Sequence, residues 1–257
     1  MTAASVVVHP NADVLAQSVA ARLATSIIDA QAARGEASIV LTGGRIAKAV
    51  YTALGASPIR DAIDWGRVDF WWGDERFLPS GDPERNETQA RDSLLDTLPV
   101  DPARVHAMPA PDGPDGDDPE AAAARYAAEL ATAAGPGSRT MPHLDVVMLG
   151  IGEDAHVASV FPGHPAVYES RDVVAVRGAP KPPSTRITLT FGGINTADEV
   201  WLIAAGGGKA DAVALALSGS GPTQTPAAGV AGVAHTRWLL DRSAAVALPA
   251  RFRSPRR

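Results

Sequence analysis

Apolar and polar residues follow two different periods along the chain, and the period changes at asparagine, glycine and proline. The segment SVVVHP at residues 5–10 is a short β-branched run, which is typical of a strand. Residues 11–30 carry an apolar side chain at every fourth position, which predicts an amphipathic helix with Asn11 as its N-cap. The apolar positions of this helix are Leu15, Val19, Leu23 and Ile27.

The same succession of strand and helix recurs along the rest of the chain. Uninterrupted apolar runs predict strands buried on both faces, and parallel neighbours need crossover connections such as helices. We therefore expect an α/β fold that is Rossmann-like and doubly wound, with a mainly parallel sheet and helices on both faces. Strands are predicted within 37–44, 68–75, 144–152, 171–178, 186–191 and 200–207, and helices within 45–54, 86–98, 119–135, 155–161, 208–219 and 236–248.

Composition is that of an ordinary globular protein, with 46% hydrophobic and 20% charged residues. A chain of 257 residues can form one large α/β domain, so we expect a single domain over 1–257. Within it, the Pro-, Gly- and Asp-rich stretch 109–120 suits a surface loop. The basic, proline-punctuated end at 250–257 is expected to be a flexible tail.

Charge, cysteine content and hydropathy narrow the class of partner. A net charge of -6, without a long basic run before the tail, argues against nucleic acid as a partner. No apolar stretch approaches the length of a membrane span, and the first residues do not resemble a signal peptide. The absence of cysteine excludes disulfides and thiolate chemistry and is compatible with a reducing compartment. We expect a cytoplasmic protein that binds neither membranes nor nucleic acids.

Ligands of open parallel sheets bind at the carboxyl ends of the strands, so the loops that follow predicted strands are the candidate site. Gly43 and Gly44 end one strand just before a helix, where backbone N–H groups can approach an anion. A plain glycine turn explains this pair equally well.

A second loop places Asp74, Glu75 and Arg76 directly after an aromatic strand, and Asn86 opens the helix that follows. An acid, an acid and a base at a strand end can bind a polar substrate, although most charged loop residues are simply solvated. For Asn86, the alternative to a role at the site is a helix N-cap.

The third loop, GIGEDAHVASVFPGH at 150–164, is the most informative. Asp154 and His156 are two residues apart, so on a turning loop the carboxylate can orient the imidazole. A histidine held in this way is a standard general base. A polar loop histidine without a role is the alternative for any single histidine.

Taken together, these motifs resemble the 6-phosphogluconolactonase family, within the superfamily of glucosamine-6-phosphate isomerases. Its glycine-rich loop, its GDER loop followed by Arg-Asn, its LGxGxDGHxASLFPG signature, its RITLT strand and its GxxKA turn occur here in the same order. They read LTGGR, WWGDERFLP with Arg85 and Asn86, LGIGEDAHVASVFPG, RITLTFGGIN and GGGKADAV, and they extend from about residue 38 to residue 241. The resemblance implies the sugar-phosphate isomerase type of α/β fold.

Two motifs depart from the family pattern. Arg45, Ile46 and Ala47 replace the usual Ser-Thr-Pro after the glycine pair, so hydroxyl contacts to phosphate are lost and Arg45 could supply a charge instead. Ala155 replaces the usual glycine before the histidine. Because a positive φ would cost alanine about 1 kcal/mol, we expect an ordinary backbone conformation at Ala155.

The resemblance implies hydrolysis of 6-phospho-D-glucono-1,5-lactone to 6-phospho-D-gluconate in the oxidative pentose phosphate pathway. It assigns His156 as the general base that activates water and Asp154 as the residue that orients it. Ser159 lacks the context of a nucleophile elbow, so a covalent route is not favoured.

Binding of the substrate phosphate requires cationic side chains. The expected phosphate and substrate groups are Gly43, Gly44, Arg45, Asp74, Glu75, Arg76, Asn86, Arg186 and Lys209. Among them, Asn86 is the candidate for binding a sugar hydroxyl. The alternative is an exposed strand-end charge for Arg186 and a solvated lysine at a helix start for Lys209. The expected partner is a small sugar-phosphate lactone, no cofactor or metal is expected, and the oligomeric state stays open.

Two other functions stay open. A glucosamine-6-phosphate deaminase would share the fold and the DE and GxDGH loops, but that family has an Asn-Glu-Pro element where this chain has SVFPGH. A sugar-phosphate sensor would usually carry an N-terminal helix-turn-helix, whereas a strand is predicted here by about residue 5. Both features favour the lactonase.

Overall fold

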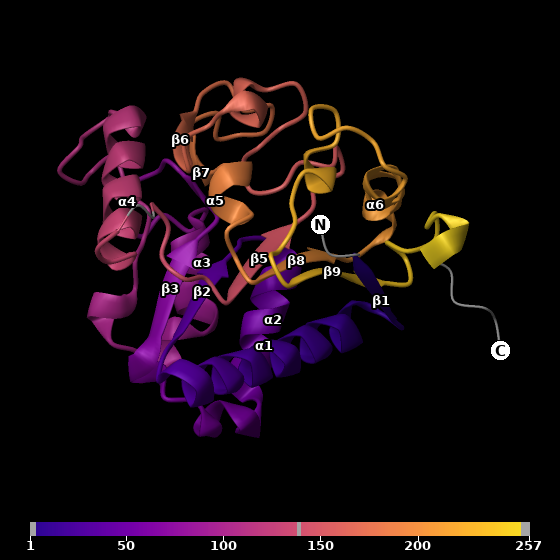
Figure 1. Cartoon of the computed structure of the whole chain (residues 1–257), viewed down its shortest axis with the longest axis horizontal. Helices are drawn as coiled ribbons and strands as arrows, with labels where there is room; N and C mark the ends of the chain where they lie inside the picture. Colours follow the sequence, from indigo (N-terminus) through magenta and orange to yellow (C-terminus); the bar gives the residue numbers. More distant parts are fainter. Residues whose placement is uncertain (1–3, 138–139, 253–257) are drawn as a thin grey trace.

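A six-stranded parallel sheet forms the centre of the molecule in the computed structural model, which describes residues 4–137 and 140–252 (Figure 1). Its strands lie in the order β1-β9-β8-β5-β2-β3 and all neighbours run parallel. The strands are β1 (Ser5–His9), β2 (Ala37–Leu41), β3 (Val68–Trp72), β5 (Val146–Gly150), β8 (Glu199–Ala204) and β9 (His235–Asp241). The predicted α/β class with a mainly parallel sheet is confirmed.

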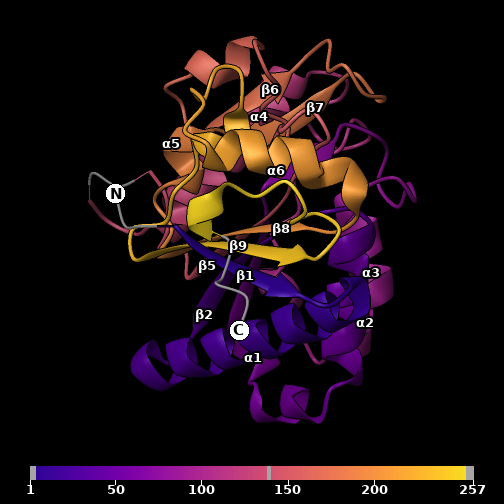
Figure 2. The same ribbon diagram turned by 90° about the vertical axis from the view of Figure 1, so that its right-hand side faces the viewer.

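Helices lie on both sides of this sheet, as predicted (Figure 2). One side carries α1 (Ala12–Arg34) and α2 (Arg45–Ala56), with α3 (Asn86–Ser93) packed beside α2. The other side carries α4 (Pro119–Ala133), α5 (Phe191–Ile194) and α6 (Ala210–Leu217). Single 3-10 turns occur at Pro58–Ala62, Trp65–Arg67, Leu95–Thr97, Pro102–Arg104, Pro165–Tyr168, Gly207–Lys209, Pro226–Ala228 and Ala250–Phe252.

Helix α1 begins and packs as its sequence predicts. The side chain of Asn11 accepts a hydrogen bond of 2.9 Å from the backbone N–H of Val14, and the chain leaves the helix at Gly35 with φ 83°. The predicted apolar positions are all buried, namely Leu15, Val19, Leu23 and Ile27. A four-residue period is therefore sufficient here to identify the face that packs on the sheet.

A second, antiparallel sheet was not predicted. Its order is β4-β7-β6, from β4 (Asp74–Arg76), β7 (Arg186–Leu189) and β6 (Val173–Val176). The predicted strands at 171–178 and 186–191 are confirmed, but they pair with each other instead of extending the parallel sheet. Helix α4 packs on this small sheet. The short connection between β6 and β7 explains the pairing, because it is too short for a parallel crossover.

Two predicted helices are wrong. The segment 236–248 contains β9, which pairs with both β1 and β8, so its apolar side chains are buried by a sheet rather than by a helix face. The segment 155–161 forms turns with an isolated bridge between Val157 and Val160. Tertiary pairing overrides the helical preference of the alanines and leucines in these segments.

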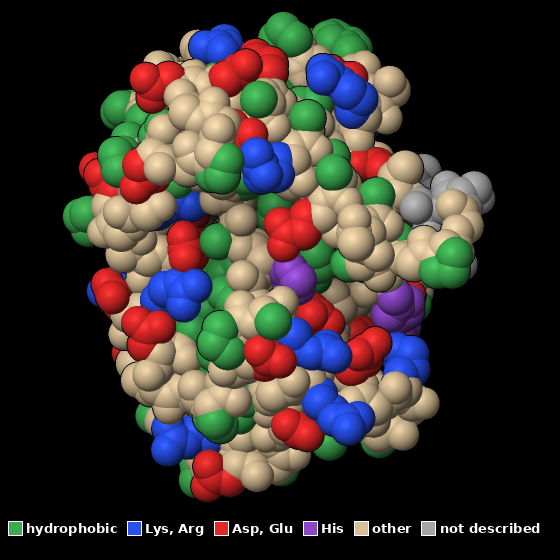
Figure 3. Space-filling model, turned by 90° about the vertical axis from the view of Figure 1, so that its left-hand side faces the viewer, with side chains coloured by type: hydrophobic (Ala, Val, Ile, Leu, Met, Phe, Trp, Pro, Cys, Tyr) green, Lys and Arg blue, Asp and Glu red, His purple; other side chains and the backbone are tan. Residues whose placement is uncertain are grey.

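The predicted flexible tail is described only in part. Of the predicted tail at 250–257, residues 250–252 form a 3-10 turn and the rest lies outside the described residues. Acidic and basic side chains are interspersed over the face in Figure 3. Within residues 4–137 and 140–252, no helix combines the length and apolarity needed to cross a membrane.

Candidate active site

The predicted loops meet at the carboxyl ends of β2 and β5, where they enclose a cavity of about 250 Å³. Eight of the predicted site residues line it, and Arg45 lines a larger adjoining cavity of about 560 Å³. Asp154 and Glu75 line neither cavity. Lys181 lines the smaller cavity and was not predicted. The eight residues are Gly43, Gly44, Asp74, Arg76, Asn86, His156, Arg186 and Lys209.

Asp154 and His156 form a hydrogen-bonded pair at the turn after β5. The imidazole Nδ1 lies 2.5 Å from Oδ1 of Asp154 and donates to it, which leaves Nε2 as the free acceptor. The backbone N–H of Gly152 donates to the carbonyl of His156 at 2.9 Å and closes the turn. A Cβ on Gly152 would lie 2.0 Å from Nδ1 of His156, so only glycine allows the pair to fold back over this position.

The expectation of an ordinary backbone at Ala155 is wrong. Ala155 has φ 65° and Ala158 has φ 48°, both in the left-handed region that favours glycine. Ala155 is buried, and its carbonyl accepts a hydrogen bond of 3.0 Å from the N–H of Ala227. Packing of this turn against the segment at Ala227 fixes a conformation that alanine adopts at a cost of about 1 kcal/mol.

Neighbouring groups determine the protonation state of Asp154. Burial raises the pKa of Asp154, but the hydrogen bond and charge of His156, together with Lys181, outweigh it and hold that pKa well below its usual range. Asp154 is therefore ionised at neutral pH and acts only as an acceptor. An ionised carboxylate on Nδ1 fixes the tautomer that presents an unprotonated Nε2, as a general base requires.

Glu75 has a structural task that the sequence did not indicate. Its carboxylate accepts hydrogen bonds from the backbone N–H groups of Arg76, Asn86 and Glu87, at 2.7, 2.7 and 2.9 Å. Burial raises the pKa of Glu75 to about 7, against the charge of buried Arg85 and these three bonds. The prediction that Glu75 binds substrate is not supported, because its carboxylate is committed to the start of α3.

Asn86 and Asp74 line the same cavity as His156. Asn86 is the first residue of α3 rather than its N-cap, and its Nδ2 donates to the carbonyl of Asp74 at 2.8 Å. A Cβ on Gly43 would lie 1.8 Å from Oδ1 of Asn86, so the glycine loop needs its first glycine for this contact. Ser159 is fully buried, its hydroxyl donates to Asp74 at 2.7 Å, and it lines neither cavity.

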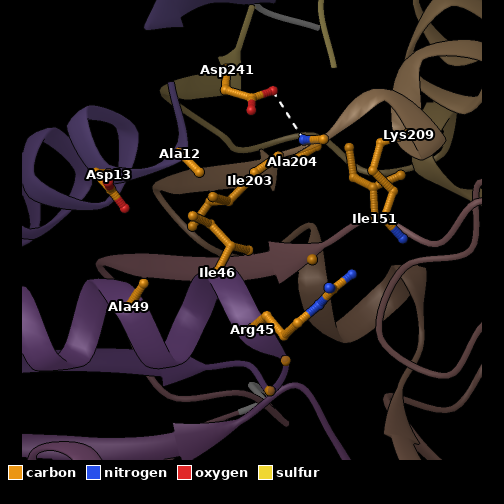
Figure 4. Close-up of a pocket in the computed structure, with 15 residues that line it drawn as sticks. Ala12, Asp13, Arg45, Ile46, Ala49, Ile151, Ile203, Ala204, Lys209 and Asp241 are labelled. Carbon is orange, nitrogen blue, oxygen red and sulfur yellow. Dashed lines mark hydrogen bonds between the residues drawn. The ribbon is translucent and has the colours of Figure 1, made fainter. Parts of the chain in front are cut away.

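The cations are divided between two ends of the site. Arg76 and Arg186 lie on the small sheet, where Nη1 of Arg186 is 3.9 Å from Asp74. Arg45 and Lys209 lie on opposite sides of the larger cavity and extend towards the same space (Figure 4). Burial lowers the pKa of Lys209, and the charge of Glu153 opposes that effect. The pair Arg45 and Lys209, with the N-terminus of α2, is suited to a dianion.

This fold, with an Asp–His pair and several cations at the carboxyl edge of its sheet, is that of a known family of sugar-phosphate enzymes. A family model described as glucosamine-6-phosphate isomerases/6-phosphogluconolactonase matches residues 10–238, and the chain belongs to this family. The resemblance found in the sequence is thereby confirmed.

Individual relatives are similar over nearly the whole chain. A 6-phosphogluconolactonase from Streptomyces coelicolor is 59% identical over 95% of this chain and 94% of its own length. A 6-phosphogluconolactonase from Mycobacterium tuberculosis is 47% identical over 95% of this chain and 98% of its own. The crystal structure of a 6-phosphogluconolactonase from Thermotoga maritima has a TM-score of 0.80 at 23% identity, covering 93% of this chain and 100% of that one. At that identity the structure supports the fold alone.

Proposed function

We propose that the protein hydrolyses 6-phospho-D-glucono-1,5-lactone to 6-phospho-D-gluconate in the oxidative pentose phosphate pathway. The observation that carries this proposal is the Asp154–His156 pair, whose imidazole lines a cavity that adjoins Arg45 and Lys209. The named activity of relatives that are 59% and 47% identical supports it. Hydrolysis of a lactone needs a base that activates water, and binding of a dianionic phosphate needs fixed cations. His156 is such a base, and Arg45 and Lys209 are such cations.

In the proposed reaction, Nε2 of His156 takes a proton from a water molecule as its oxygen bonds to C1 of the lactone. The carbonyl electrons move to oxygen and give a tetrahedral intermediate. When the carbonyl re-forms, the bond between C1 and the ring oxygen breaks, and His156 returns the proton to the leaving oxygen. Asp154 holds the imidazole and stabilises its transient positive charge.

We propose that the phosphate binds between Arg45 and Lys209, beside the backbone of Gly43 and Gly44. Both side chains extend into the same space, and the N-terminus of α2 is directed towards it. Arg76, Arg186 and Asn86 would then bind the sugar hydroxyls and the carbonyl region, since they line the smaller cavity with His156.

Two further properties belong to the same proposal. We propose that catalysis needs no metal, because His156 can generate the nucleophile from water without one; dialysis against a chelator should leave kcat/KM unchanged. We also propose a cytoplasmic location, as the absence of cysteine allows, with no nucleic-acid or membrane partner.

The decisive experiment measures acid release or a coupled oxidation of 6-phosphogluconate with freshly prepared lactone. The wild-type protein should accelerate hydrolysis far above the spontaneous rate, and His156→Ala should not. Glucosamine 6-phosphate is the matched alternative substrate, with ammonia as the product measured. Ammonia release without any acceleration of lactone hydrolysis would assign the deaminase activity instead.

A further inference from the structure

Lys181 approaches the catalytic pair from a different part of the chain. Its Nζ lies 3.3 Å from Oδ1 of Asp154, the same oxygen that accepts the hydrogen bond from Nδ1 of His156. Lys181 lies in the connection between β6 and β7, and it lines the cavity beside His156. One carboxylate oxygen therefore joins an ammonium group and an imidazole.

Arg186 holds the backbone that carries this lysine. Its Nε and Nη2 donate to the carbonyl oxygens of residues 181–183, each at 3.1 Å, and its side chain is 7% exposed. The guanidinium also lies over the ring of Phe161, 5.7 Å from its centroid, and the imidazole of His156 packs on the same ring at 4.5 Å. Arg186, which holds the loop of Lys181, and the general base His156 therefore both pack on the ring of Phe161.

The carboxylate of Asp154 and the ammonium group of Lys181 have opposite effects on the protonation of His156. A lone carboxylate beside an imidazole favours the protonated ring, whereas a general base must start unprotonated. An ammonium group on the same carboxylate offsets part of that effect. The other charged groups that line the cavity with His156 are Asp74 and Arg76 of β4, Arg186 of β7 and Lys209 after β8, and Glu153 of the loop of His156 interacts with Lys209. Lys181 differs from these cations by its direct contact with the orienting carboxylate.

We propose that Lys181 is a positioning residue for the general base: it binds Asp154 and offsets its charge, so that His156 remains oriented and unprotonated at neutral pH. This inference rests on the proposed function, since it requires His156 to accept a proton. Arg186 serves it by fixing the loop, because its Nε and Nη2 donate to carbonyl oxygens of that loop.

The test compares Lys181→Met, which removes the charge, with Lys181→Arg, which keeps it. In the pH profile of kcat/KM, the acid limb of Lys181→Met should move to higher pH by roughly one unit, with KM on the alkaline plateau nearly unchanged. Lys181→Arg should restore most of this shift. Lys48→Met is the matched control, because Lys48 is exposed on α2 and lines neither cavity. Lys181→Gln repeats the charge removal, so the test does not depend on one variant folding.

A raised KM with an unmoved acid limb would show that Lys181 contacts only substrate, and an unchanged enzyme would show that it has no role; either result overturns the inference. An NMR titration of the His156 imidazole in wild type and Lys181→Met, without substrate, gives a second readout. The midpoint should rise in the variant. Because this measurement needs no turnover, it separates failure of the inference from failure of the proposed function.

Discussion

Among single residues, His156 is the one whose removal should abolish chemistry without disturbing the fold. It is partly exposed, and its ring packs on one face of buried Phe161 and contacts the carboxylate of Asp154. His156→Ala should lower kcat by roughly 10²- to 10⁴-fold with KM and the midpoint of thermal unfolding nearly unchanged. Asp154→Asn should lower kcat less, and the wild-type rate should fall at acid pH as the imidazole is protonated.

Steady-state kinetics with His235→Ala as a control check this prediction, because His235 is exposed at the start of β9. If His156→Ala keeps the wild-type kcat, the proton acceptor lies elsewhere, and Asp74 is then the next carboxylate to substitute.

The phosphate site gives a prediction about binding rather than chemistry. Arg45→Ala and Lys209→Ala should each raise KM at least tenfold with a smaller effect on kcat, since each removes a cation that binds the phosphate throughout the reaction. Unphosphorylated gluconolactone should be a poor substrate for the wild type and should be nearly insensitive to both substitutions. Lys48→Ala is the exposed control on the same helix as Arg45. Equal kcat/KM for the two lactones would show that the phosphate is not recognised.

The sequence predicted most of the residues that line the site, and the exceptions have physical causes. Asp154 and His156 are close in sequence, so their contact depends on one turn. Lys181 meets Asp154 across 27 positions, and no local pattern indicates a contact that depends on the second sheet. Glu75 is adjacent in sequence to two residues that line the cavity, but the unpaired N–H groups at the start of α3 bind its carboxylate instead.

At the scale of elements, Glu75 links the end of β4 to the start of α3. Glu75→Ala should lower the free energy of unfolding by about 2–4 kcal/mol, because buried N–H groups and Arg85 would lose a partner. The substitution should change stability more than it changes KM. Urea unfolding measures the effect, with exposed Glu84→Ala as the control. If the variant is as stable as the wild type but binds substrate much more weakly, Glu75 contributes to substrate binding.

Strand and helix patterns identified elements well where one face of an element is buried, as in α1. They also identified the buried strands β2, β5 and β8, but they failed for β9. The segment 236–248 has apolar residues at spacings that suit a helix, but β9 lies between β1 and β8 and is covered on both faces. The antiparallel pairing of β6 with β7 could have been inferred from their short connection, which leaves no room for a crossover helix.

At the scale of the whole molecule, a charged network at the opposite end of β3 joins the sheet to α4. His106 lies between Asp69 of β3, 3.1 Å from Nε2, and Glu129 of α4, 2.7 Å from Nδ1. Its ring stacks on buried Trp71 with centroids 3.8 Å apart. The network therefore connects three separate segments far from the catalytic cavity, and its loss should affect stability rather than activity.

The pH dependence of stability tests this network. Burial lowers the pKa of His106, but the hydrogen bonds and charges of Asp69 and Glu129 outweigh burial and raise the pKa to about 9. In the unfolded chain a histidine titrates near 6.5. Because the folded pKa is the higher one, the stabilisation is fully present below about pH 6.5 and is lost as pH rises through about 9. Wild type and His106→Gln should therefore differ in free energy of unfolding by about 3 kcal/mol more at pH 6 than at pH 10. Urea unfolding of both proteins at the two pH values measures how the stability difference between them changes with pH. Groups that titrate alike in both proteins do not contribute to this change. A gap that stays constant with pH would mean that His106 stabilises the fold only by packing on Trp71.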